Sequence, residues 1–167
     1  MRKVPAVAFV TRYYCPEQHT TFGLLPDFYA SRVPGTLDDI ERTAAQAEAS
    51  SSLEHAAEEL RPGDDPCAVT LSVAVAWVRR RVAWVRALLL IVAGLFPDLF
   101  ADVGPSVRAF RERLSTSRVL VALRGICEPY LYALSPPLGL NPRAPGTPTR
   151  GSERPQSIGE APSRDRR

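Results

Sequence analysis

The sequence predicts a mostly α-helical protein with a small N-terminal β-hairpin, about five helices and a disordered C-terminal tail. Prolines and glycines are dense in the first 35 residues and exclude a long helix there. From Thr36 to Leu134, apolar residues recur at helical spacing. Beyond Asn141, the chain is rich in proline, glycine and arginine and has too few apolar residues to form a core. We therefore divide the 167 residues into segments 1–35, 36–140 and 141–167.

The first segment contains one good strand candidate. Residues 7–14 combine valine, phenylalanine and two tyrosines, which are residues that favour strands. Residues 20–25 are able to pair back on this strand across a turn at 15–19. The sequence therefore predicts a single hairpin rather than a larger sheet.

Two short helices are expected next. Thr36 is positioned to cap the first, over 36–49, and Asp38 and Asp39 fall in its first turn, where the helix dipole favours anions. Ser51 and Glu54 have the spacing of a capping box for the second, over 51–60, which the Pro62-Gly63 pair ends.

Three further helices complete the predicted domain. They cover residues 71–95, a stretch starting at Ser106, and residues 118–134, and they are separated by Pro97 and by Gly104-Pro105. Their large apolar residues are expected to form the core: Trp77, Trp84, Leu88, Leu95, Phe96, Phe110, Leu114, Leu120 and Leu123.

Cysteine content and hydropathy limit the class of protein. Cys15, Cys67 and Cys127 are odd in number and form no CxxC pair, which argues against a disulfide scaffold and favours a reducing, cytoplasmic location. The longest apolar run, over 87–97, has eleven residues, well short of the roughly 20 that span a bilayer. Residues 1–14 lack the pattern of a signal peptide, because Pro5 interrupts their apolar run.

Charge is divided into blocks along the chain. The net charge is +3, and the six arginines and three acids of residues 141–167 account for all of it. Residues 36–66 carry nine acids against two arginines, whereas residues 77–124 carry nine arginines against three acids. An acidic block therefore precedes a basic block, and the two are expected to pair unless the arginines serve another partner.

Residues 12–26 hold the sharpest local motif. An aromatic strand leads to Cys15 and His19, and a T-T-F-G-L-L-P run follows. This stretch resembles the second knuckle of the zinc-ribbon segments of transposases and of accessory proteins in insertion elements, and the resemblance covers residues 10–34 well and 36–134 loosely. It implies that segment 1–35 is a zinc-ribbon remnant with Cys15 and His19 as metal ligands.

The first ligand pair of such a ribbon is absent, because no cysteine or histidine precedes Cys15. We therefore expect no cofactor unless zinc receives its other ligands from upstream or from a partner. The resemblance also implies an N-terminus shortened relative to the family. In the alternative interpretation, Cys15 is a small buried apolar residue and His19 is a turn residue.

The helices over 52–60 and 71–95 together suggest a helix-turn-helix. Small alanines in the first would allow close packing, and the second carries Arg79, Arg80, Arg81 and Arg86 after Trp77. Arginines on a helix in the major groove read guanine edges and hold phosphates. We therefore predict these four arginines as DNA contacts, with a solvated face that pairs with the acidic block as the alternative.

No catalytic constellation accompanies the helices. Asp38, Asp39, Glu41, Asp64 and Asp65 are adjacent carboxylates without a suitable histidine or serine, and there is no glycine-rich phosphate loop. The sequence thus predicts a non-catalytic protein, and the resemblance implies a DNA-binding accessory or regulatory protein of a mobile element, with double-stranded DNA, and a transposase or a second copy, as partners. A helical protein-interaction module, a decayed fragment and a membrane-surface helix over 84–100 remain the alternatives.

Overall fold

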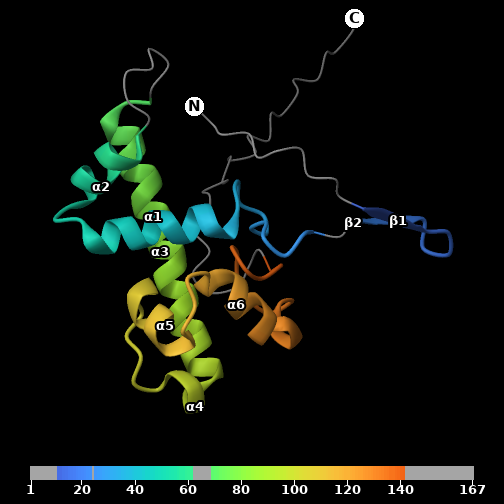
Figure 1. The fold of residues 1–167 in the computed structure, drawn as a ribbon. Helices are drawn as coiled ribbons and strands as arrows, with labels where there is room; N and C mark the ends of the chain where they lie inside the picture. The colour runs from blue at the N-terminus through green and yellow to red at the C-terminus, as the bar shows by residue number, and fades with distance from the viewer. Residues whose placement is uncertain (1–10, 24, 62–68, 142–167) are drawn as a thin grey trace, which may run out of the picture.

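A computed structural model describes residues 11–23, 25–61 and 69–141 (Figure 1). The fold is mostly helical with a two-stranded hairpin near the N-terminus, as predicted. Its elements are β1 (Arg12–Cys15), β2 (Thr20–Gly23), α1 (Leu37–Ala49), α2 (Leu53–Leu60), α3 (Leu71–Leu95), α4 (Pro97–Phe100), α5 (Val107–Leu114), α6 (Val119–Ile126) and a 3₁₀ turn, η1 (Glu128–Tyr130). The predicted tail, from residue 142 onward, lies outside the described residues.

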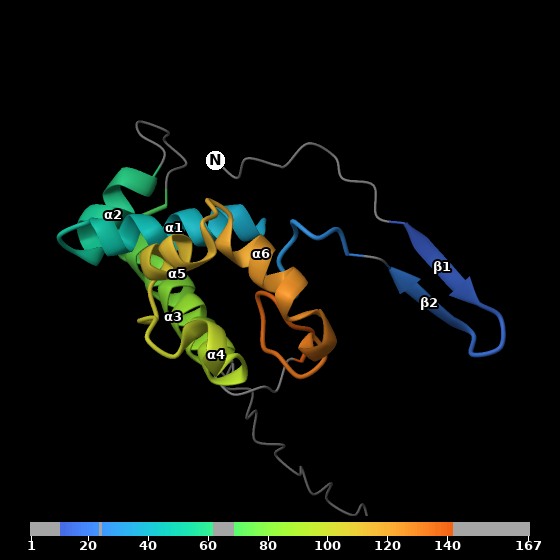
Figure 2. The same ribbon diagram turned by 60° about the horizontal axis from the view of Figure 1, so that its bottom comes forward.

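The hairpin is antiparallel and projects away from the helices in both views (Figures 1 and 2). Tyr13 pairs with Phe22 and Cys15 with Thr20, so the turn consists of residues 16–19. His19 ends this turn with a φ of 49°, in the left-handed region. The strands are shorter than predicted within the described residues, and positions 7–10 and 24 lie outside them.

The predicted cap of α1 is confirmed, and that of α2 is shifted by one residue. The Thr36 hydroxyl accepts from the amide of Asp39 at 3.1 Å. Ser52 rather than Ser51 caps α2, accepting from the amide of His55 at 3.1 Å, so the predicted capping box is wrong. Three consecutive serines offer equivalent caps, and sequence spacing alone does not choose among them.

The main core lies where α3 meets α1, α5 and α6. Leu88, Phe110, Leu120 and Leu123 are fully buried there, as predicted, and the ring of Phe110 stacks on that of Phe100 at 4.7 Å between centroids. A second, smaller cluster forms where α2 packs on the N-terminal half of α3, through Ala57, Ala74, Val75, Val78 and Val82. Helix α3 therefore contributes residues to both clusters and connects them (Figure 2).

Part of the predicted core is wrong. Trp77 and Leu95 are 37% and 38% exposed, Trp84 is half-buried, and Phe96 and Leu114 only border the core. Helix α3 is apolar around most of its circumference, so its hydrophobic pattern does not fix which side faces inward. Among the described residues, no helix combines the length and apolar character needed to span a bilayer.

The last helix ends eight residues earlier than predicted. Helix α6 stops at Ile126, and the chain continues through η1 at Pro129. Gly125 weakens the helix, and the proline ring disfavours helical geometry at Glu128. The following residues instead fold back as turns onto the segment before α1.

Arg124 joins that segment to the helices. The residue is 8% exposed, and its guanidinium donates to the carbonyl oxygens of Asp27 at 2.8 Å and Leu138 at 3.2 Å, and to the Ser31 hydroxyl at 2.9 Å. Burial lowers the pKa of Arg124, and the charge of Asp27 opposes this. Residues 26–35 therefore pack with the helices.

Candidate functional site

One side of helix α3 is buried and the opposite side is exposed. Its buried residues, which include Ala74, Val78, Val85 and Val92, follow one side at helical spacing. The opposite side leaves residues exposed along the length of the helix, and we call it the outer face of α3. Its exposed residues are Ser72, Val73, Ala76, Trp77, Arg79, Arg80, Ala83, Arg86, Leu90, Gly94 and Leu95.

Three of the four arginines predicted to contact DNA lie on this outer face. Arg79, Arg80 and Arg86 are exposed, and none of them forms a hydrogen bond or ion pair with any residue in the described part of the chain. Beside Arg79, a shallow hollow of about 400 Å³ opens between α2 and α3, with Glu54 on its α2 side. The outer face of α3 therefore carries positive charge that no described residue neutralises through an ion pair.

Arg81, also predicted to contact DNA, is buried and does not lie with this exposed group. It is 6% exposed, its Nη2 donates to the Pro34 carbonyl at 3.1 Å, and its guanidinium carbon lies 3.9 Å from the centre of the Trp77 ring. Burial lowers its pKa to about 10, partly offset by the charge of Asp39. The buried guanidinium of Arg81 therefore packs against the ring of Trp77 and helps to hold it in place.

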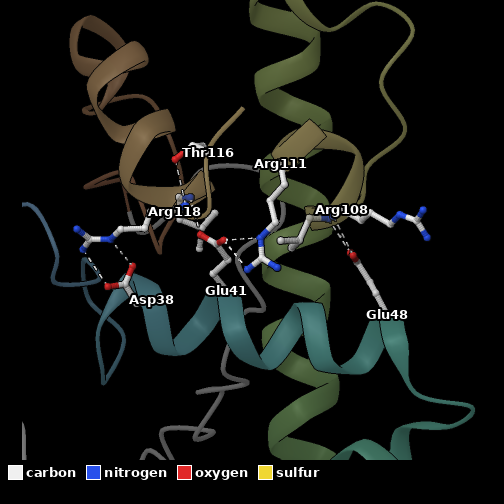
Figure 3. Close-up of polar contacts among 9 residues, drawn as sticks. Asp38, Glu41, Glu48, Arg108, Arg111, Thr116 and Arg118 are labelled. Carbon is white, nitrogen blue, oxygen red and sulfur yellow. Dashed lines mark hydrogen bonds and ion pairs between the residues drawn. The ribbon is translucent and has the colours of Figure 1, made fainter. Parts of the chain in front are cut away.

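The acidic block pairs with other arginines than those of α3. Asp38 forms a bidentate pair with Arg118 at 3.0 and 2.9 Å (Figure 3). The hydrogen bond with Asp38 is the main reason that the pKa of Arg118 is raised. Further along α1, Glu41 binds Arg111 of α5. The expected pairing of an acidic with a basic block therefore occurs, but with arginines of α5 and the start of α6.

Two α1 carboxylates also bind the beginnings of α5 and α6. Glu48 accepts from the amides of Val107 and Arg108 at 2.8 and 3.2 Å, and Glu41 accepts from the amide of Leu120 at 3.0 Å (Figure 3). Such amides have no partner within their own helix and attract carboxylates. These two acids therefore connect α1 to α5 and α6. Asp64 and Asp65 lie outside the described residues.

The predicted metal ligands lie at the two ends of the hairpin turn. Cys15 is half-buried, and the hydroxyl of Tyr14 shares a hydrogen bond of 3.0 Å with Nδ1 of His19. No group of three or more histidine, cysteine or acidic side chains close enough to hold a metal occurs in the described part of the chain. Cys15 and His19 remain a two-residue set, and zinc binding remains a prediction.

A membrane-surface helix over 84–100 fits the structure poorly. Leu88, Leu89, Val92 and Phe100 are fully buried in the main core, so these side chains are not available to a lipid surface. Leu90 and Leu95 of α3 are exposed with the buried Val92 between them, and Leu99 of α4 is exposed directly before the buried Phe100.

Three of the predicted arginines are exposed on the outer face of α3, and the apolar residues of this face were not predicted to be exposed. Trp77 was assigned to the core, and Val73 and Leu90 received no external role, although they are 52% and 58% exposed. The available signal was a helix with apolar residues on all sides, which implies a second contact surface. Comparison with protein-family models, curated proteins and solved structures finds no match to this chain.

Proposed function

We propose that the chain is a non-catalytic protein-binding module and that the outer face of α3 is its contact surface. The observation that carries this proposal is the exposure of Val73, Trp77, Leu90 and Leu95 along one helix of 25 residues. Large apolar side chains exposed along one helix favour a partner, because covering them contributes roughly 25 cal/mol per Å² of apolar surface removed from water.

The composition of the face also favours a protein partner. Tryptophan and arginine are the residues most enriched among those that dominate protein–protein binding energies. Trp77 is held against Arg81 on one side and is 37% exposed, so little side-chain entropy remains to be lost on binding. The face thus combines an anchored aromatic residue with three arginines that have no partner among the described residues.

A photo-crosslinking amino acid tests this proposal in cells that express the full chain. We expect Leu90→p-benzoylphenylalanine to give a discrete protein adduct, and the same replacement at Arg113, an exposed α5 residue, to give none. A Val73→Asp substitution should abolish the adduct, because a carboxylate in an apolar contact is left unpaired. Equal adducts at both positions, or an adduct that survives Val73→Asp, would contradict the proposal.

DNA binding is the second candidate, favoured by the three arginines without intramolecular partners. As an accessory or regulatory protein of a mobile element, the chain would place Arg79, Arg80 and Arg86 against phosphates and base edges. Two features argue against it. The arginines start in the third turn of α3, and ten residues separate α2 from α3, compared with the 3 to 4 residues usual in a helix-turn-helix.

Fluorescence anisotropy with duplex DNA across a salt series separates the two candidates. DNA binding predicts an affinity that falls steeply with salt, with a slope that drops by roughly one unit for each arginine replaced by glutamine at positions 79, 80 and 86. Arg113→Gln on α5 is the matched control. An unchanged slope in the triple variant would remove DNA as the partner of α3.

A further inference from the structure

We infer that the partner of the outer face is an acidic amphipathic helix. This inference rests on the proposed function, since it names the chemistry of the protein that the face would bind. Three properties of the face carry it: the spacing of its side chains, its charge, and the position of Arg80.

The spacing of the face favours a helix as its occupant. Residues 73, 77, 80, 84, 87 and 91 follow one another at alternating intervals of four and three, the repeat by which one helix packs along another. Trp77, Trp84 and Ile91 occupy every seventh position of this seam, and Ala87 and Gly94 leave room beside them. Trp84 and Ile91 are half-buried, so a helix lying on the seam would complete their burial.

The charge of the face selects an acidic partner. Helix α3 contains four arginines and no acidic residue. Arg79, Arg80 and Arg86 are exposed and lack partners among the described residues, whereas Arg111 and Arg118 of the same basic block are bound by α1. Glu54 of α2 is the acid at the edge of the face, beside Arg79. Among the described residues, the three arginines of the outer face outnumber this one acid, and carboxylates of a partner would balance the surplus.

Arg80 places one of these charges within the apolar seam. It lies between Trp77 and Trp84 in the seam and is exposed. A single polar residue at a seam position fixes the register of a helix pair, since an unmatched charge there is left desolvated. The partner therefore needs a carboxylate opposite Arg80. A second copy of α3 would bring more arginines instead, and like charges disfavour that pairing.

Two designed helical peptides test the inference on the full chain. Both are 25 residues long, matching α3, and share a leucine seam, but one carries glutamate and the other lysine at every flanking position. The two tryptophans of the chain both lie on α3, so their emission reports occupancy of this face directly. We expect the glutamate peptide to shift the emission to shorter wavelength and to bind roughly tenfold more tightly than the lysine peptide at about 0.1 M salt.

Variants assign the effect to its cause. An Arg79→Gln, Arg80→Gln, Arg86→Gln chain should lose the preference for glutamate, while an Arg12→Gln, Arg113→Gln chain, altered at exposed arginines outside α3, should keep it. A Val73→Asp, Leu90→Asp chain, altered at one seam position and at one exposed position that flanks the seam, should bind both peptides more weakly. Circular dichroism and urea titration of each variant establish that it folds.

The outcomes separate the inference from the function on which it rests. Equal affinity for the two peptides, abolished by Val73→Asp, Leu90→Asp, would overturn the acidic partner and leave the protein-binding face standing. No emission shift with either peptide up to about 1 mM would overturn both. Sedimentation showing a dimer that the two aspartates dissociate would replace the acidic helix by a second copy, and displacement of the glutamate peptide by duplex DNA would replace it by nucleic acid.

Discussion

The guanidinium of Arg111 on α5 donates to Oε1 of Glu41 on α1 from two nitrogens, at 3.1 and 2.9 Å, although Glu41 itself is only 1% exposed. The other oxygen of Glu41 accepts from the amide of Leu120 at the start of α6, at 3.0 Å. One buried carboxylate therefore joins three helices. The acid is satisfied by two different groups, so removing either group leaves part of its charge unpaired.

Arg111→Met is expected to lower the free energy of unfolding by about 3 kcal/mol, because it leaves the Glu41 carboxylate buried without its cation. Glu41→Gln should cost less, about 1 to 2 kcal/mol, since an amide oxygen still accepts from Leu120. Urea unfolding measures both. Arg108→Met, which removes the exposed pair with Glu112, is the control and should change stability by less than about 0.5 kcal/mol. An Arg111→Met chain as stable as this control would contradict the prediction.

Arg124→Lys is expected to destabilise the packing of residues 26–31 against the C-terminal turns. A lysine has one nitrogen in place of the two guanidinium nitrogens that serve Asp27, Ser31 and Leu138, so buried acceptors lose their donors. Each unsatisfied buried group costs about 1 to 3 kcal/mol. We expect a loss of about 2 to 4 kcal/mol, read as a lower melting temperature.

The control for Arg124→Lys is Arg113→Lys on α5, whose side chain is exposed and has no partner among the described residues. It should leave the melting temperature unchanged. If both substitutions shift the melting temperature equally, the contacts of Arg124 do not secure this part of the fold.

The helices were predictable because their signals are local. Thr36 with Asp38 and Asp39 marks the start of α1, and residues 71–95 were bounded correctly by their apolar content and by Pro97. The apolar pattern of α3 does not specify which side of the helix faces the core, and for that reason the prediction that Trp77 is a core residue is wrong. The roles of Glu41, Arg81 and Arg124 depend on partners 70, 47 and more than 90 residues away. Such contacts leave no periodic trace in the sequence.

Cys127 should make the protein less stable at alkaline pH. It is fully buried, and burial raises the pKa of its thiol from 9.0 to about 11. Between these values the unfolded chain has lost the thiol proton and the folded chain retains it, so stability is full below about pH 9 and falls as the pH approaches 11. At about 1.4 kcal/mol per pKa unit, the loss is about 3 kcal/mol.

Urea unfolding at several pH values, compared between the parent chain and Cys127→Ala, isolates this contribution because the other titrating groups are common to both. The difference in stability between the two chains should shrink above pH 9. A difference that stays constant from pH 8 to pH 11 would show that the thiol does not titrate as its burial requires.

Arg81→Met is expected to separate the structural from the binding role of the α3 arginines. Arg81 is buried, and its Nη1 has no hydrogen-bond partner among the described residues, so methionine preserves the aliphatic packing and removes a desolvated charge. We expect stability to rise by about 1 kcal/mol, since replacing buried charges by apolar groups is often neutral or stabilising. Arg81→Lys keeps the charge but loses the guanidinium stack on Trp77 and should lower stability.

Exposed Arg80→Gln should leave stability unchanged and weaken binding of the acidic peptide, a loss that Arg81→Met should not produce. Urea unfolding and tryptophan emission on the same samples measure the two effects, and a loss of more than about 2 kcal/mol in Arg81→Met would instead make the buried charge, with Asp39 nearby, a net source of stability.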